Sequence, residues 1–127
     1  MRVVLVRHAE ALPGDPDELR PLSAAGRDHA REIATVLAAH KPNAVLTSPL
    51  LRARETADPI AKASGLEAEV EPLLGPGATA AGLRDAVENH GDTVIAVCHQ
   101  PDLSDIVFEL TGEHISFSPG SVHEVVL

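Results

Sequence analysis

The sequence predicts an α/β fold in which helices cover both faces of a mostly parallel sheet. Two continuous apolar runs rich in β-branched residues, at 2–6 (RVVLV) and within 91–99 (GDTVIAVCH), are typical of strands buried on both faces. Other segments carry apolar residues at i, i+3, i+4 and i+7, the spacing of a helix with one buried face. Strands that alternate with such helices form parallel sheets.

The first strand is followed by a polar, Pro-rich loop at 12–22 (LPGDPDELRPL). Ser23 is a residue type that caps helices, and it predicts a helix from there to about Ala39. The apolar stripe of this helix consists of Ala30, Ile33, Ala34 and Leu37. We expect this stripe to pack on the sheet.

The middle of the chain continues the alternation. A short strand at 44–48 (AVLTS) precedes a helix from about 50 to 64, and a small strand follows at 67–72 (EAEVEP). Pro59 lies inside the predicted helix and favours a kink or an early end, because proline has no amide N–H to donate. A Gly- and Pro-rich loop at 75–82 comes next.

The last third predicts two more helices and a strand pair. The segment 83–89 is expected to be helical and to lead into the strand at 91–99. The helix after it carries apolar residues at helical spacing, namely Leu103, Ile106, Val107 and Leu110. Two final strands, at 114–117 and 122–127, are predicted to turn at 118–121 (SPGS).

Length and composition restrict the possible functions. The 127 residues predict a single domain, 1–127, with a core of aliphatic residues, since aromatics make up only 2%. Ten Lys and Arg against 19 Asp and Glu give a net charge of −9, which argues against nucleic-acid binding. The single cysteine, Cys98, excludes an internal disulfide and is interpreted as a small buried hydrophobe. No segment resembles a signal peptide or a membrane span, so we expect a cytoplasmic protein with no membrane partner.

Polar residues stand where three predicted strands end. The pairs are Arg7-His8, Thr47-Ser48 and Cys98-His99. In parallel α/β sheets, ligands bind beyond the carboxyl ends of the strands. The three pairs are therefore expected to meet at one edge of the sheet.

The residue types at this edge suit phosphoryl transfer. A neutral imidazole is a nucleophile towards phosphorus when a backbone carbonyl fixes its other ring nitrogen. Fixed cations stabilise the charge on the transferring oxygens, and arginine provides a planar fork of donors. We assign His8 as the nucleophile and Arg7, Arg52 and His99 as the group that binds the oxygens.

Four segments carry a resemblance to a known family. They are RHAEA (7–11), RPLSAAG (20–26), TSPLLRARETA (47–57) and VCHQP (97–101). In this order they resemble the signature segments of the histidine phosphatase (phosphoglycerate mutase-like) superfamily, and their spacing resembles its small phosphohistidine phosphatase branch of the SixA type.

The resemblance implies a three-layer α/β/α sandwich, an Arg7-His8 pair, a second arginine at Arg52 and a second histidine at His99. It also implies that Arg20 reaches the substrate phosphate. We further expect Ser48 to contact substrate.

The acid that protonates an oxygen leaving group in related mutases and phosphatases has no evident counterpart here. The residue at the matching position is Leu73, and Glu71 is the acid beside it. Glu10 and Asp102 are also expected near the site and stay open as alternatives. A phosphorylated imidazole leaves more readily than an alkoxide, so a phosphohistidine substrate tolerates the missing acid.

The short chain lacks the insertions that cover the pocket of the mutases, which predicts an open pocket suited to a phosphohistidine on another protein. The leading prediction is a phosphohistidine phosphatase that acts without a metal or other cofactor. The alternatives are a phosphatase for small phosphorylated esters and a catalytically silent phosphate-binding module. The other five histidines have no metal-ligand spacing and are interpreted as surface or capping residues: His29, His40, His90, His114 and His123.

Overall fold

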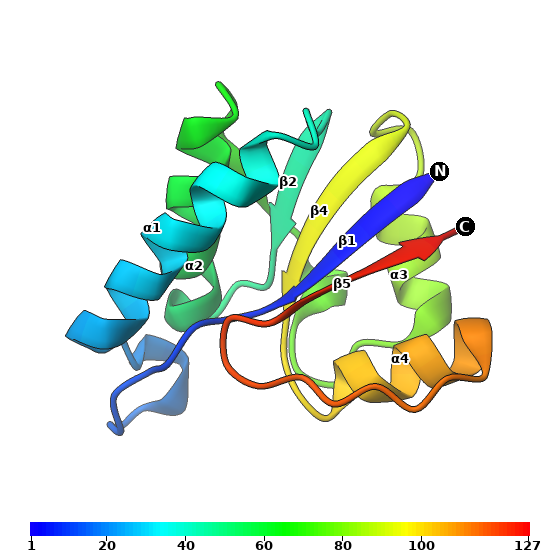
Figure 1. The fold of residues 1–127 in the computed structure, drawn as a ribbon. Helices are drawn as coiled ribbons and strands as arrows, with labels where there is room; N and C mark the ends of the chain where they lie inside the picture. The colour runs from blue at the N-terminus through cyan, green and yellow to red at the C-terminus, as the bar shows by residue number, and fades with distance from the viewer.

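A five-stranded sheet forms the centre of the computed structural model, which describes residues 1–127 (Figure 1). The strands are β1 (Arg2–Arg7), β2 (Ala44–Thr47), β3 (Ala68–Val70), β4 (Thr93–Cys98) and β5 (Val122–Val126). They lie in the order β3-β2-β4-β1-β5. The first four are parallel, and β5 pairs antiparallel with β1 at the edge of the sheet.

Helices cover both faces of this sheet, as predicted. The helices α1 (Ala24–Ala38) and α2 (Leu51–Ala63) lie on one face, and α3 (Ala80–Val87) and α4 (Asp102–Thr111) on the other (Figure 1). Alternate residues of β1 point to opposite faces: Val3 and Leu5 pack with α3 and α4, whereas Val4 and Val6 pack with α1 and α2. The predicted three-layer α/β/α sandwich is confirmed.

The predicted helix after the Pro-rich loop is confirmed. Ser23 caps α1, with its hydroxyl oxygen accepting from the Gly26 amide at 3.0 Å. Gly26 packs so tightly against the chain after β1 that a Cβ there would overlap the Glu10 carbonyl oxygen. The base of the loop is closed by the Ser23 amide, which donates to the same Glu10 carbonyl at 2.9 Å, and by a bridge between Ala11 and Leu22. The loop is therefore held against the start of α1.

The predicted helix from about 50 to 64 is confirmed, and of the two effects expected from Pro59 the early end does not occur, because α2 continues to Ala63. Ile60 and Ala61 lie just beyond the proline and are buried against the sheet. Their burial holds the last turn in helical form although Pro59 cannot donate a backbone hydrogen bond.

The predicted strand at 114–117 does not form, and only its partner becomes a strand, β5. Side chains hold the segment instead. The Ser104 hydroxyl donates to the Ile115 carbonyl, and Arg7 donates to the Phe117 carbonyl at 2.8 Å. The segment then passes beside α4 rather than along β5, which already pairs with β1.

Two short 3₁₀ turns were not predicted: η1 (Asp17–Leu19) in the Pro-rich loop and η2 (Pro72–Leu74) after β3. None of the helices combines the length and the apolar character that crossing a bilayer requires.

Candidate active site

The three polar pairs that follow strands lie at one end of the sheet. β4 lies between β2 and β1, so His99 stands between Ser48 and His8. Backbone bonds extend the pairing past the strand ends: the Ser48 amide donates to Val97 at 3.0 Å and the His8 amide to Cys98 at 3.2 Å. The rings of His8 and His99 have centroids 5.2 Å apart. The expected meeting of the strand ends is thus found.

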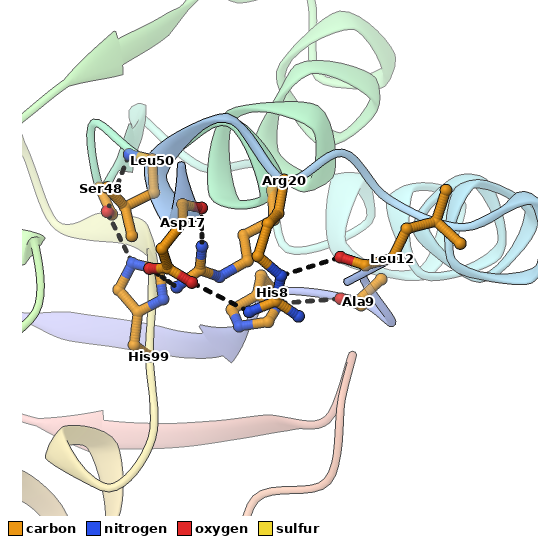
Figure 2. A network of polar contacts seen from close by, with 9 residues as sticks. His8, Ala9, Leu12, Asp17, Arg20, Ser48, Leu50 and His99 are labelled. Carbon is orange, nitrogen blue, oxygen red and sulfur yellow. Dashed lines mark hydrogen bonds and ion pairs between the residues drawn. The ribbon is translucent and has the colours of Figure 1, made fainter. Parts of the chain in front are cut away.

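The imidazole of His8 is fixed by a backbone carbonyl. Its Nδ1 lies 2.8 Å from the Ala9 carbonyl oxygen (Figure 2). A carbonyl only accepts hydrogen bonds, so Nδ1 carries the proton and Nε2 of the neutral ring is left with its lone pair. The pKa of His8 is lowered to about 4, first by burial and then by the charges of Arg52, Arg7 and Arg20, against the opposing effect of the Ala9 hydrogen bond. The ring is therefore a neutral imidazole at pH 7, with an unprotonated Nε2.

Ser48 fixes the second imidazole. Its Oγ lies 2.7 Å from Nε2 of His99 and accepts from the Leu50 amide at 3.2 Å (Figure 2). We assign the serine proton to Nε2, which leaves the proton of a neutral His99 ring on Nδ1. Nδ1 is buried and has no partner within the protein.

The pKa of His99 is also lowered to about 4, first by burial and then by the charges of His8 and Arg52. The Asp17 charge raises it and opposes part of this effect. His99 is consequently neutral at pH 7 and acts as a hydrogen-bond donor rather than as a cation.

Two of the predicted arginines are anchored by backbone groups. Arg7 ends β1 and donates from Nη1 to the Phe117 carbonyl, while its Nε is buried without a partner. Arg52 lies in the first turn of α2 with 9% of its side chain exposed, and its Nη1 donates to the Asp17 carbonyl at 2.9 Å. Because backbone atoms hold both guanidinium groups, few rotamers are left to be ordered when an anion binds.

Arg20 approaches the cluster from the Pro-rich loop. Its Nε donates to the Leu12 carbonyl at 2.8 Å, and its Nη1 lies 3.1 Å from Oδ1 of Asp17 (Figure 2). The other carboxylate oxygen of Asp17 lies 3.2 Å from Nη2 of Arg52. One carboxylate therefore joins both guanidinium groups.

The three acids considered in the sequence analysis are engaged elsewhere. Glu10 accepts from the Ser23 hydroxyl at 2.8 Å, Glu71 from the Leu73 amide at 2.9 Å, and Asp102 from the Gly77 amide at 2.8 Å. None of the three is hydrogen-bonded to the two histidines or to the three arginines of the cluster. The acid that does contact the cluster is Asp17.

Three contributors to the site were not found from the sequence: Asp17, the Phe117 carbonyl and Thr56. Thr56 is buried on α2, where its Oγ1 accepts from the Ala9 amide at 3.0 Å and donates to the Arg52 carbonyl at 2.8 Å. It thereby joins the loop that carries His8 to the helix that carries Arg52. The one available signal for Asp17 was its position three residues before Arg20.

None of the surface pockets includes a residue of the cluster. The pockets of the surface are elsewhere, the largest of them between α1 and α2 at Arg27, Arg31 and Lys62. In the 127 residues no group of three or more His, Cys, Asp or Glu is arranged to hold a metal ion.

The chain is similar to known proteins over nearly its whole length. Residues 3–75 match the histidine phosphatase superfamily (branch 1). The chain is 36% identical over 120 residues to phosphohistidine phosphatase SixA of Escherichia coli (strain K12). This match covers 87% of this chain and 74% of that relative. It is 27% identical over 144 residues to a phosphohistidine phosphatase SixA homolog of Haemophilus influenzae, covering 99% of this chain and 88% of that relative. A solved structure of protein histidine phosphatase SixA complexed with tungstate matches it with a TM-score of 0.87 at 32% identity, over 100% of this chain and 88% of that one.

Proposed function

The chain belongs to the histidine phosphatase superfamily (branch 1), and we propose that it is a phosphohistidine phosphatase that moves the phosphoryl group of a protein phosphohistidine onto His8 and then to water. The family acts without a metal ion. A protein that bears phosphohistidine is the proposed partner, and the cytoplasm is the proposed location.

The observation that carries this proposal is that two residues predicted to bind the phosphoryl oxygens each carry a buried nitrogen atom without a hydrogen-bond partner. Nε of Arg7 and Nδ1 of His99 are both buried and unpaired, although buried donors almost always find an acceptor. An anion with several oxygens would satisfy both donors at once. Tungstate, bound in the similar SixA structure, is such an oxyanion.

The first chemical step follows from the tautomer of His8. Nε2 attacks phosphorus, and the bond between phosphorus and the substrate ring breaks, with its electron pair staying on the substrate nitrogen. The proton stays on Nδ1, hydrogen-bonded to the Ala9 carbonyl, so the imidazole ring of phospho-His8 is cationic. Arg7, Arg52 and His99 hold the phosphoryl oxygens as the charge on them redistributes.

The second step uses the same proton. Water attacks the phosphorus of phospho-His8, and the electron pair of the P–N bond returns to Nε2. Because Nδ1 already carries a proton, His8 leaves as a neutral imidazole, which is a far better leaving group than an imidazolate. The water's proton passes to solvent, and inorganic phosphate is released.

Phosphohistidine is favoured over an oxygen ester for two reasons. Glu10, Glu71 and Asp102 are each bonded to a backbone or serine group, and none is hydrogen-bonded to the histidines or arginines of the cluster. Without such an acid an alkoxide would have to leave unprotonated. No surface pocket encloses the cluster, which suits a histidine that projects from a folded partner.

Trapping the phosphorylated enzyme tests the proposal. Brief incubation with phosphoimidazole or a phosphohistidine-bearing protein should place acid-labile, base-stable phosphate on His8, located by mass spectrometry. His8→Asn should abolish both labelling and phosphate release, whereas His123→Asn on β5 should preserve both. Normal turnover by His8→Asn would sink the mechanism, a preference for phosphate esters would favour a small-molecule phosphatase, and binding without release would indicate a silent module.

A further inference from the structure

Asp17 is a negative charge placed at the edge of a site built for anions. Its carboxylate lies 3.1 Å from Nη1 of Arg20 and 3.2 Å from Nη2 of Arg52. These two cations lower the pKa of Asp17, so the group is ionised at neutral pH and has no proton to donate. It therefore cannot serve as the missing general acid.

The carboxylate lies on the solvent side of the cluster. The Asp17 side chain is 58% exposed, whereas that of Arg52 is 9% exposed. The Asp17 carboxylate accepts one N–H from Arg20 and one from Arg52. The Asp17 backbone carbonyl accepts a second N–H from Arg52. Each guanidinium has five N–H donors, so both retain free donors for phosphoryl oxygens. Asp17 and a bound phosphoryl group can thus be held by the same arginines.

The leaving group of the proposed reaction has a special need. In phosphohistidine one ring nitrogen carries phosphorus, and the other must be protonated for the ring to depart as neutral imidazole. In-line attack by Nε2 of His8 puts the departing ring on the far side of phosphorus. A ring that belongs to another protein approaches from the solvent, the side on which Asp17 is exposed.

We propose that Asp17 accepts a hydrogen bond from the distal ring N–H of the substrate imidazole and so selects phosphohistidine over phosphate esters. The inference rests on the proposed function. A proton from solvent resides on the distal nitrogen before the P–N bond breaks. Nε2 of His8 then bonds to phosphorus, and the electron pair of the broken P–N bond stays on the departing nitrogen. The substrate ring leaves as a neutral imidazole whose distal N–H is still hydrogen-bonded to Asp17.

The same carboxylate disfavours oxygen leaving groups. An alkoxide or phenolate departs with negative charge, and a nearby ionised carboxylate repels that charge. A protonated phosphoimidazole ring is cationic and is attracted. The charge of Asp17 therefore acts in opposite directions on the two substrate classes.

The test compares Asp17→Asn with Asp15→Asn at pH 7 on two small substrates, phosphoimidazole and p-nitrophenyl phosphate. Asp15 lies in the same loop, is exposed, and has no hydrogen bond or ion pair through its carboxylate, so it controls for the change in net charge. Asparagine retains one side-chain oxygen, for Arg20 or Arg52, and the bond from Arg52 to the backbone carbonyl of residue 17 is unaffected. Loss of a charge-assisted hydrogen bond should lower kcat/KM for phosphoimidazole about 10- to 100-fold. The value for p-nitrophenyl phosphate should stay within about twofold or rise, and Asp15→Asn should leave both unchanged.

Other outcomes overturn the inference. Equal losses on both substrates would mean that Asp17 only positions Arg52. Equal gains, together with tighter binding of inorganic phosphate, would mean that Asp17 merely competes with the anion. Failure of the proposed function itself is a separate result, since the wild-type protein would then not hydrolyse phosphoimidazole or carry phosphate on His8.

Discussion

At the scale of single residues, the direction of the hydrogen bond between Ser48 and His99 decides what His99 can do. The Ser48 Oγ accepts from the Leu50 amide, and its proton is assigned to Nε2 of His99. The His99 proton is then on Nδ1, the buried atom without a partner. The expected substrate contact of Ser48 becomes, in this geometry, a proposal that it acts through His99.

Ser48→Ala should therefore weaken catalysis without removing any predicted phosphate ligand. Without the serine proton, both tautomers of His99 become accessible, and the one protonated at Nε2 offers no donor at Nδ1. We expect kcat/KM for phosphoimidazole to fall roughly tenfold, the effect of losing one uncharged donor to the transition state. Ser116→Ala, at an exposed serine near the carboxyl end, is the control and should have no effect. An unchanged rate in Ser48→Ala would show that His99 does not need its partner.

The positions of Arg7, His8, Arg52 and His99 could be predicted because each follows a recognisable strand or opens a helix. Asp17 could not be predicted in the same way. It lies in an irregular loop. Its contact with Arg20 depends on the position of that side chain, which is held by a hydrogen bond to the Leu12 carbonyl. Sequence periodicity carries no information on such a path.

At the scale of elements, the site depends on how the segment after β1 is joined to α2. Thr56 makes this junction, accepting from the Ala9 amide and donating to the Arg52 carbonyl. Ala9 and Thr56 are both fully buried, so no water can replace the bond. The distance between nucleophile and arginine thus depends on one hydroxyl.

Thr56→Val should lower the free energy of unfolding and the activity together. Valine keeps the shape but leaves the buried Ala9 amide without an acceptor, at a cost of about 1–3 kcal/mol. Urea unfolding measures that cost, and phosphate release at 25 °C measures the effect on the site. Thr56→Ser keeps the hydroxyl and should retain most of both. If valine were as stable as threonine, the junction would not be held by this bond.

The elements themselves were predicted well where the pattern was long and less well where it was short. The helix capped by Ser23 and the two long apolar strands have many residues that support one interpretation. The segment 114–117 has only four, and its β-like composition arises because Ile115 and Phe117 pack on or in the core. The proline inside α2 does not end the helix, because burial of Ile60 outweighs the local preference.

At the scale of the whole molecule, a net charge of −9 coexists with a cluster of three arginines beside two neutral histidines. Burial and these arginines keep both imidazoles uncharged in the folded chain. In the unfolded chain the same groups titrate near 6.5. As the pH falls, the two histidines therefore bind protons in the unfolded chain before they do so in the folded chain.

This difference predicts the pH dependence of stability. The folded pKa of His8 and His99 is about 4, so the unfolded chain binds more protons between about pH 6.5 and 4. The free energy of unfolding should be constant above that window and should fall by about 2–3 kcal/mol from pH 7 to pH 4.5, after allowance for screening by solvent. Urea unfolding at several pH values measures this slope.

The double variant His8→Asn/His99→Asn should flatten the slope above pH 5, where carboxylates contribute little. An equally steep decline in the double variant would assign the effect to other groups.

Cys98 lies next to His99, fully buried, and burial together with the charge of Asp102 raises the pKa of its thiol to about 12. Peroxides and alkylating reagents attack the thiolate, which is almost absent at such a pKa. Since imidazole and guanidinium groups perform the proposed chemistry, the site has no catalytic thiolate that an oxidant could inactivate. Its activity is thereby separated from redox control, in contrast to phosphatases whose nucleophile is a cysteine.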